Sequence, residues 1–185
     1  LRKHTRIKKE PILDRNKKTI PLDLKNINDK VIVKKLITKA DVLIEGFRPG
    51  VMERLGLGPK DCEKINPKLV FGRITGWGQD GPYAKKAGHD INYLAVTGAL
   101  NAIGYKHSEP IPPLNLLGDY AGGTMFLIMG ILSALWERNT SNKGQVVDAA
   151  MIEGVPALMS LIHTFMAQDN WNNDRSSNLI DGGCP

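Results

Sequence analysis

The chain has 185 residues, with 25 Lys or Arg against 19 Asp or Glu, and its formal net charge is +6. This length can bury one substantial core, so one domain is expected. The basic excess is concentrated in residues 1–18 and has no interleaved aromatic side chains, which argues against nucleic-acid recognition. The same charge suits an anionic ligand, because it attracts one over a long range.

The two cysteines, Cys62 and Cys184, lie far apart and neither belongs to a CxxC pair. The sequence therefore predicts neither a disulfide framework nor a zinc site, and His, Cys and carboxylates form no other cluster at metal-ligand spacing. The longest apolar run, residues 125–136, is too short to span a bilayer, and no charged-then-apolar leader opens the chain. We expect a soluble, intracellular protein without a membrane span.

Strand and helix signals alternate in the first half of the chain. In order, they predict a strand at residues 19–24, a helix capped by Asn26 or Asn28 that runs through Ile37, a strand at 41–45, short helices at 51–55 and 61–65, and a strand at 69–75. Pro21 would restrict the first strand to an edge or a strand start. Strand, helix and strand in this order indicate right-handed parallel crossovers, so the predicted fold class is α/β.

The second half is more helical. Residues 124–138 predict a long buried helix that is hydrophobic nearly all round, 143–149 a turn and strand, and 150–167 a further apolar helix. We expect five methionines to fill the core: Met125, Met129, Met151, Met159 and Met166. His107 has polar neighbours and is expected to face solvent, whereas His163 is expected to be packed or half-buried on its helix.

Loops beyond the carboxyl ends of parallel strands are where α/β proteins bind ligands. Arg48, Arg73 and the 76–79 turn are expected at such ends. The Gly-x-Gly of that turn lacks the third glycine of a dinucleotide fingerprint, so a nicotinamide enzyme is rejected.

Two ionisable residues, His89 and Asp119, each lie beside a predicted helix start. Two helix starts facing one cleft would present a base and an acid together. Residue type alone leaves simpler roles open, because Asp119 would also serve as a helix N-cap and His89 as an ordinary loop histidine.

Several motifs carry a family resemblance. They are Gly-His-Asp-Ile-Asn-Tyr-Leu-Ala at 88–95, Pro-Leu-Asn-Leu-Leu-Gly-Asp at 113–119, and the segments 44–56, 73–79 and 143–149. From about residue 18 to residue 185 the chain closely resembles the alpha-methylacyl-CoA racemases of the family III CoA-transferase (CaiB/BaiF-type) superfamily. The resemblance implies a Rossmann-like parallel sheet with flanking helices.

The same resemblance implies that residues 18–185 are an incomplete large domain, and that residues 1–17 are a basic arm unlike the family. Full-length members form interlocked homodimers, so we expect a fragment whose own activity is crippled or missing. The expected context is lipid and fatty acid metabolism, in the peroxisome or mitochondrion of a eukaryote or the cytoplasm of a bacterium.

The implied reaction is inversion at the carbon next to the carbonyl of a 2-methyl-branched acyl-CoA thioester, through an enolate. By similarity, His89 and Asp119 exchange the roles of base and acid on opposite faces of that carbon. Coenzyme A enters as part of the substrate, and no other cofactor and no metal are expected. The residues implied in CoA binding are Leu22, Asp23, Leu24, Lys25, Arg54, Ala87, Gly88, His89, Asp90, Ile91 and Asn92. Lys25 and Arg54 also fit ordinary solvated surface charges.

Two other readings stay open. A CoA-transferase of the same superfamily would use Asp119 as a nucleophile and needs no histidine base, so His89 favours the racemase. A non-catalytic CoA-binding fragment would keep the binding residues but perform no proton transfer.

Overall fold

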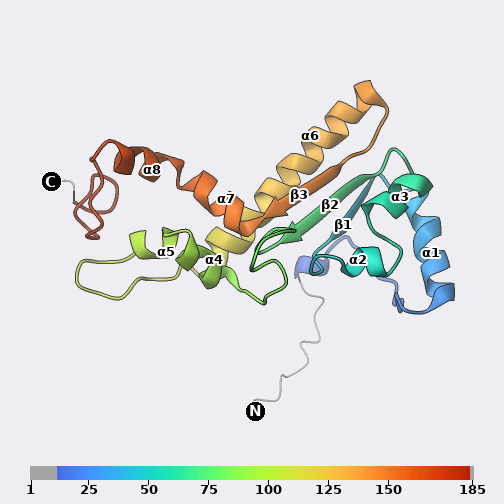
Figure 1. Cartoon of the computed structure of the whole chain (residues 1–185), viewed down its shortest axis with the longest axis horizontal. Helices are drawn as coiled ribbons and strands as arrows, with labels where there is room; N and C mark the ends of the chain where they lie inside the picture. The colour runs from blue at the N-terminus through green and yellow to red at the C-terminus, as the bar shows by residue number, and fades with distance from the viewer. Residues whose placement is uncertain (1–11, 184–185) are drawn as a thin grey trace, which may run out of the picture.

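A computed structural model describes residues 12–183, and its centre is a parallel three-stranded sheet (Figure 1). The strands are β1 (Val42–Glu45), β2 (Val70–Thr75) and β3 (Val146–Ala150), in the order β1-β2-β3. Val42 pairs with Val70, and Phe71 pairs with Val146. The α/β class and these three strands confirm the sequence prediction. Most of the expected basic arm, residues 1–11, lies outside the described residues.

Helices follow and flank the strands. They are η1 (Ile12–Asp14), α1 (Ile27–Ile37), α2 (Val51–Arg54), α3 (Pro59–Ile65), α4 (Asp90–Val96), α5 (Ala99–Ala102), the π-helix η2 (Leu116–Met125), α6 (Phe126–Ser141), α7 (Met151–Leu158) and α8 (Ser160–Ala167). Asn26 caps α1 as predicted, because its side chain accepts a 2.8 Å hydrogen bond from the amide of Asn28.

The middle strand divides the core between two faces of the sheet. Successive side chains of a strand point to opposite faces, so Val70 packs with α6 while Phe71 packs with α1, α2 and α3. Leu127, Ile131 and Ala134 complete the α6 side. Both faces of β2 are therefore buried, as expected of a central parallel strand.

The strand predicted at residues 19–24 is wrong, because these residues pair with no strand. Pro21 has no amide to donate, and local side chains occupy neighbouring ones: Asp29 accepts from the amide of Asp23 at 2.8 Å, and Asp23 accepts from that of Lys25 at 2.9 Å. The segment is an ordered lead-in to α1, and Leu24 is its contact with the core.

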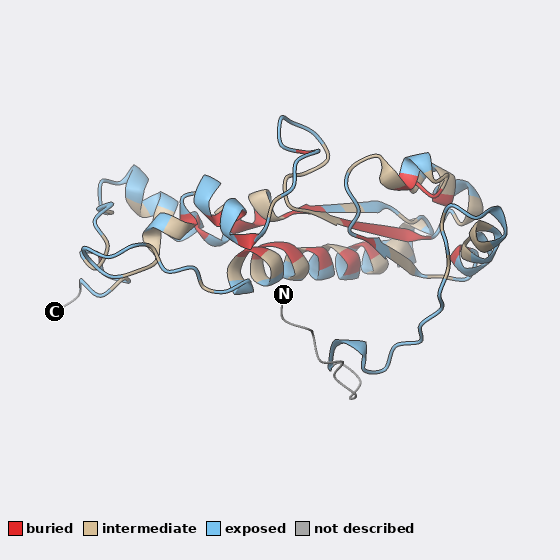
Figure 2. Cartoon of the chain, turned by 90° about the horizontal axis from the view of Figure 1, so that it is seen from below, coloured by how far each residue is buried: buried red, intermediate tan, exposed pale blue. Residues whose placement is uncertain are grey.

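The helix predicted at 124–138 is longer and less buried than expected. It begins eight residues earlier as η2 and continues through α6, so residues 116–141 form one helix of 26 residues. Only one stripe of α6 is buried against the sheet, and Figure 2 shows an exposed stripe alternating with it. Trp136 is 81% exposed and Leu132 61% exposed, which corrects the expectation of burial all round.

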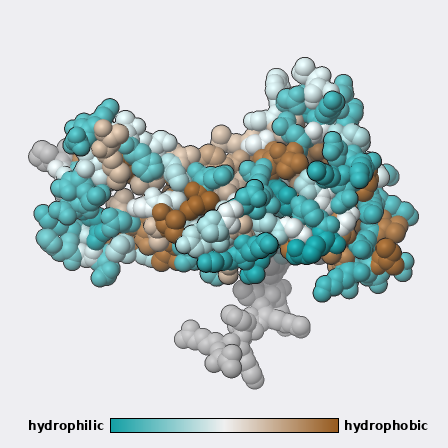
Figure 3. All heavy atoms as spheres, viewed as in Figure 1, coloured by the Kyte–Doolittle hydropathy of each residue, from teal (hydrophilic) through white to brown (hydrophobic). Residues whose placement is uncertain are grey.

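By length and composition this helix is apolar enough to cross a membrane. One such helix is weak evidence for a span, although only 28% of its most apolar window is buried, less than is usual for a core helix that meets the same criterion. Another apolar surface lies on α1, where Ile27, Val31 and Leu36 are exposed; α1 lies at the right edge of Figure 1, where Figure 3 shows hydrophobic atoms.

Other burial expectations had mixed outcomes. Met159 is buried and Met151 half-buried, but Met125, Met129 and Met166 are exposed, so they are not core filler. His107 is exposed as predicted. His163 is exposed rather than packed. The helix predicted at 150–167 is divided at Met159 into α7 and α8, and α7 continues past Pro156 to Leu158.

Candidate active site

A pocket of about 380 Å³ lies at the carboxyl ends of β1 and β2. Its walls are residues 46–49 after β1, residues 75–77 at the end of β2, and part of the 84–93 segment, including His89 and Tyr93. This is the place where parallel α/β sheets bind ligands. Two basic residues, Arg48 and Lys86, also line it, which suits an anionic ligand.

Tyr93 forms the buried side of this pocket. It is only 5% exposed, and its ring meets that of Trp77 edge-on with the centroids 4.8 Å apart. A Cβ on Gly76 would lie 2.0 Å from the tyrosine hydroxyl, so only glycine fits at that position. Burial, together with the negative charges of Asp119 and Asp90, raises the pKa of Tyr93. The hydroxyl therefore stays protonated at neutral pH and can donate a hydrogen bond.

His89 lies at the start of α4, as the sequence predicts. Its backbone is held from both sides: its amide donates to Oδ1 of Asn92 at 2.9 Å, and its carbonyl accepts from the amide of Asn92 at 2.8 Å. The residue is exposed and lines the pocket. The helix start thus fixes the backbone of His89 and leaves the residue open to a ligand.

Asp119 lies in the first turns of η2 rather than just before the helix. The helix begins at Leu116 with Asn115 as its N-cap, so the reading of Asp119 as a simple N-cap is wrong. The residue is half-buried, and Nδ2 of Asn115 lies 3.5 Å from its Oδ2. Glycines behind it allow a close approach of α7: a Cβ on Gly154 would lie 1.8 Å from the carbonyl oxygen of Gly122.

Asp90 joins the two helix starts. Its Oδ2 accepts hydrogen bonds from the amides of Gly118 at 2.8 Å and Asp119 at 2.7 Å. Because Asp90 directly follows His89 in the chain, these bonds place the beginning of α4 against the beginning of η2. The structure therefore brings the backbones that carry His89 and Asp119 together, but of these two residues only His89 lines the pocket.

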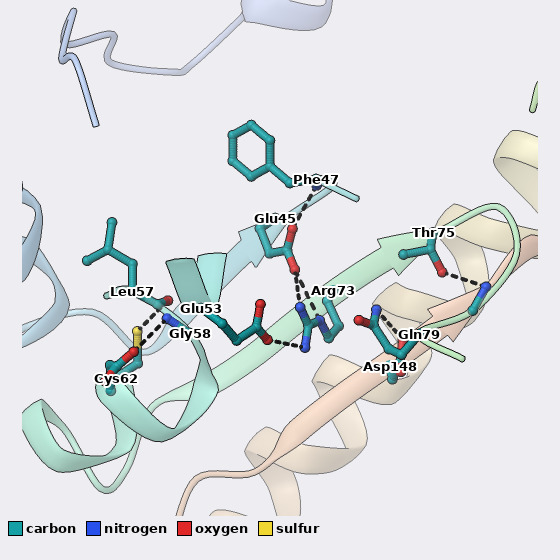
Figure 4. Close-up of polar contacts among 12 residues, drawn as sticks. Glu45, Phe47, Glu53, Leu57, Gly58, Cys62, Arg73, Thr75, Gln79 and Asp148 are labelled. Atoms are coloured by element: carbon teal, nitrogen blue, oxygen red, sulfur yellow. Dashed lines mark hydrogen bonds and ion pairs between the residues drawn. The ribbon is translucent and has the colours of Figure 1, made fainter. Parts of the chain in front are cut away.

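Arg73 is buried and forms an ion-pair network with Glu45 and Glu53 (Figure 4). Its guanidinium lies 3.0 Å from Oε1 of Glu45 and 3.0 Å from Oε1 of Glu53. Oε2 of Glu45 accepts a 2.7 Å hydrogen bond from the amide of Phe47, so the network anchors the first wall of the pocket. Arg73 is thus a paired residue inside β2, which corrects its expected place at the strand end.

Glu53, the partner of Arg73 on α2, has a shifted pKa. Burial alone would raise the pKa of Glu53, but its own backbone amide, the hydrogen bond and charge of Arg73 and the charge of Arg54 together lower it below its ordinary value. Arg54 is exposed on α2 and lies outside the pocket lining. Its charge is one of the causes of the lowered pKa of Glu53.

The expected CoA-binding residues fall into two groups. Ala87, Gly88 and His89 line the pocket, and Asp90 lies buried behind it. The others are outside its lining: Leu22, Asp23, Leu24, Lys25, Arg54, Ile91 and Asn92. Among residues 12–183 no group of three His, Cys, Asp or Glu side chains could hold a metal.

Sequence reasoning missed several pocket residues. Phe47, Lys86 and Tyr93 line the pocket but were not proposed as site residues, whereas Arg48 and Trp77 of the 76–79 turn line it at the strand ends where the sequence placed them. In the sequence, only the positions of the missed residues after β1 or β2, or near the start of α4, could have indicated that they line a pocket.

A parallel α/β domain with two helix starts meeting beside a strand-end pocket agrees with the comparison to protein families. Residues 11–181 match the model of CoA-transferase family III, and the chain belongs to that family.

Among its relatives, the alpha-methylacyl-CoA racemase of Mus musculus is 45% identical over 176 residues, which cover 95% of this chain and 46% of the relative. The succinyl-CoA--D-citramalate CoA-transferase of Chloroflexus aurantiacus is 36% identical, covering 95% of this chain and 43% of the relative. The crystal structure of a CaiB/BaiF family protein from Brucella suis matches with a TM-score of 0.77 and 30% identity, covering 84% of this chain and 41% of that one. The chain spans less than half the length of these relatives.

Proposed function

We propose that the protein carrying this chain is an acyl-CoA racemase that inverts the α-carbon of 2-methyl-branched acyl-CoA thioesters. The likeness to the mouse racemase, at 45% identity, supports the reaction class. The observation that carries the mechanism is the contact of Asp90 with Gly118 and Asp119, because it brings the helix start bearing His89 to the one bearing Asp119.

The chemistry requires a base, an acid and donors for an enolate. The proton next to a thioester carbonyl is weakly acidic, so its removal needs a base on one face of the carbon and stabilisation of the oxygen that becomes negative. His89 removes the proton in one direction while Asp119 delivers one to the other face, and the roles reverse in the other direction. The first two amides of α4, those of Asp90 and Ile91, precede the amide of Asn92 that donates to His89, and they are the candidate donors to the oxygen.

Coenzyme A is anionic, and the pocket presents Arg48 and Lys86 beside the Ala87–Gly88–His89 segment. Arginine suits phosphate through its fork of donors, and lysine through its point charge. The proposal therefore adds these two residues to those that the sequence motifs imply for CoA binding.

The test is exchange of the α-proton of a 2-methylacyl-CoA in deuterated water, followed by mass spectrometry. The enzyme is the complete natural polypeptide that carries these residues. We expect His89→Ala and Asp119→Ala each to lower the exchange rate about 10²–10⁴-fold, the usual contribution of a general acid or base, while CoA binding is retained. His107→Ala, on an exposed loop, is the matched histidine control and should exchange at the wild-type rate. Exchange that persists at that rate in both site variants would refute the mechanism.

A CoA-transferase with Asp119 as nucleophile is the second candidate, supported by the Chloroflexus aurantiacus relative at 36% identity. That reaction forms an anhydride between the Asp119 carboxylate and the acyl group as the thioester bond breaks and CoA leaves as thiolate. Hydroxylamine would trap the anhydride as a hydroxamate on Asp119. Such an adduct, formed without α-proton exchange, would select the transferase.

A further inference from the structure

The Asp90 side chain is an unusual buried carboxylate. The residue is 6% exposed and begins α4, while both of its hydrogen bonds go to another helix, η2. Its second oxygen, Oδ1, is buried and has no hydrogen-bond partner in the described part of the chain. A buried group left half satisfied calls for a specific reason, because burying a carboxylate is costly unless it is paired.

A salt bridge does not provide that reason. Within residues 12–183 the ion pairs are those of Arg73 with Glu45 and Glu53 and of Arg138 with Asp41. The Asp90 carboxylate instead accepts hydrogen bonds from two amides. Such bonds are shorter and stronger to a charged acceptor than to a neutral one. These amides lie near the start of η2, where donors lack acceptors within their own helix.

The contact acts on the residue that would carry the acid. One of the two bonds is to the amide of Asp119 itself, at 2.7 Å, which restrains the backbone from which its carboxyl group projects. The neighbouring position is shaped for the same contact, since a Cβ on Gly118 would lie 2.6 Å from Oδ2 of Asp90. Asp90 also follows His89 directly in the chain. A single carboxylate thus links both members of the pair.

From this geometry we infer that Asp90 is a positioning residue that sets the placement of Asp119 relative to His89 for proton transfer. The inference rests on the proposed racemase function. Its chemical basis is that proton transfer requires reacting groups in near-attack geometry, where a displacement of about 1 Å costs about 10²-fold in rate. Asp90 makes no contact with substrate in this role and acts through the backbone of η2.

The kinetic test compares two substitutions in the complete natural polypeptide. Asp90→Ala removes both hydrogen bonds, and we expect α-proton exchange at saturating 2-methylacyl-CoA to fall about 100-fold with KM changed less than about threefold. Asp90→Asn keeps an oxygen that can accept from both amides, so it should recover exchange to within about tenfold of wild type. A loss confined to KM, or equal losses in both variants, would overturn the positioning role.

A matched control is Asp61→Ala. Asp61 is also a carboxylate that accepts an amide hydrogen bond at a helix start, from Gly58 at 3.3 Å, but it lies at α3 outside the pocket lining. It should lose some thermal stability and retain wild-type exchange. If Asp90→Ala lowers activity only in proportion to its loss of folded protein, as Asp61→Ala would, then Asp90 is a structural cap and the inference fails.

Amide hydrogen exchange tests the same inference without relying on activity. Mass spectrometry of the peptide spanning residues 116–120 should show faster deuterium uptake in Asp90→Ala than in wild type, and near-normal uptake in Asp90→Asn and Asp61→Ala. Unchanged uptake in Asp90→Ala would overturn the inference whatever the kinetics. If the wild-type enzyme introduces no deuterium at the α-carbon of the substrate, the proposed function is refuted. The peptide data would still show whether Asp90 holds the backbone of Asp119.

Discussion

Arg73 is the position where substitution should reveal most about what supports the pocket. Its guanidinium pairs with Glu45, whose side chain is 2% exposed, and with Glu53, whose side chain is 44% exposed. Arg73→Met would leave the Glu45 carboxylate buried with the amide of Phe47 as its remaining partner. Removing one partner of a buried ion pair typically costs about 3–5 kcal/mol. A domain with a stability of about 5–15 kcal/mol would lose a large part of it.

The two acidic partners should differ, because solvent screens the exposed one. Glu53→Gln should cost no more than about 1 kcal/mol, the usual value of an exposed pair. Glu45→Gln placed in the Arg73→Met background should recover part of the loss, since it removes the unpaired buried charge.

Urea unfolding followed by circular dichroism measures these differences. With a slope of about 2 kcal/mol per molar urea, Arg73→Met should lower the midpoint by roughly 2 M and Glu53→Gln by less than about 0.5 M. A shift below about 0.5 M for Arg73→Met, or equal shifts for the two single variants, would show that the buried pair does not stabilise this wall of the pocket.

Three further predictions follow from burial and close contact. Leu94, which is fully buried, should lose about 2–5 kcal/mol of unfolding free energy on substitution by Ala, and a loss under 1 kcal/mol in a thermal melt would contradict its place in the core. Gly154→Ala should both destabilise the fold and slow α-proton exchange, because its Cβ would meet the carbonyl of Gly122; a variant as stable and active as wild type would disprove this close packing. Burial and the charge of Asp61 raise the pKa of Cys62 to about 11 from 9.0. The folded state therefore holds the thiol proton more tightly than the unfolded state. The contribution of Cys62 to the free energy of unfolding is complete below pH 9 and should be lost between about pH 9 and 11. In native protein the Cys62 peptide should resist iodoacetamide at pH 8 and react quickly in urea; rapid native labelling would contradict the burial.

Local sequence signals predicted the elements whose causes are local. The apolar runs of β1 and β2 and the Asn26 cap of α1 were visible in the chain itself. The strand proposed at 19–24 failed because Asp23 and Asp29 hold backbone amides that a strand would have paired. Alternation of residue types cannot reveal that competition.

Contacts between distant segments set the features that the sequence did not show. The glycines of η2 lower helix propensity, so its start was missed; the helix is packed closely against α7 through Gly122 and Gly154. Arg73 was recognised as basic, but its pairing with Glu45 depends on parallel strand register. His89 and Asp119 were identified through motifs, whereas the carboxylate of Asp90 that joins their helices was visible only in three dimensions.

The π-helical form of η2 has a consequence for how the family can vary. Hydrogen bonds that close five residues apart accommodate an extra residue compared with an α-helix. Losing one codon between Asp119 and α6 would let the segment relax to the commoner helix and leave the sheet intact. The part of η2 before the deletion would then turn by about 100° relative to α6, the step of one α-helical residue, and Asp119 would face elsewhere. The length of the chain at this one place therefore determines the direction in which the Asp119 side chain faces.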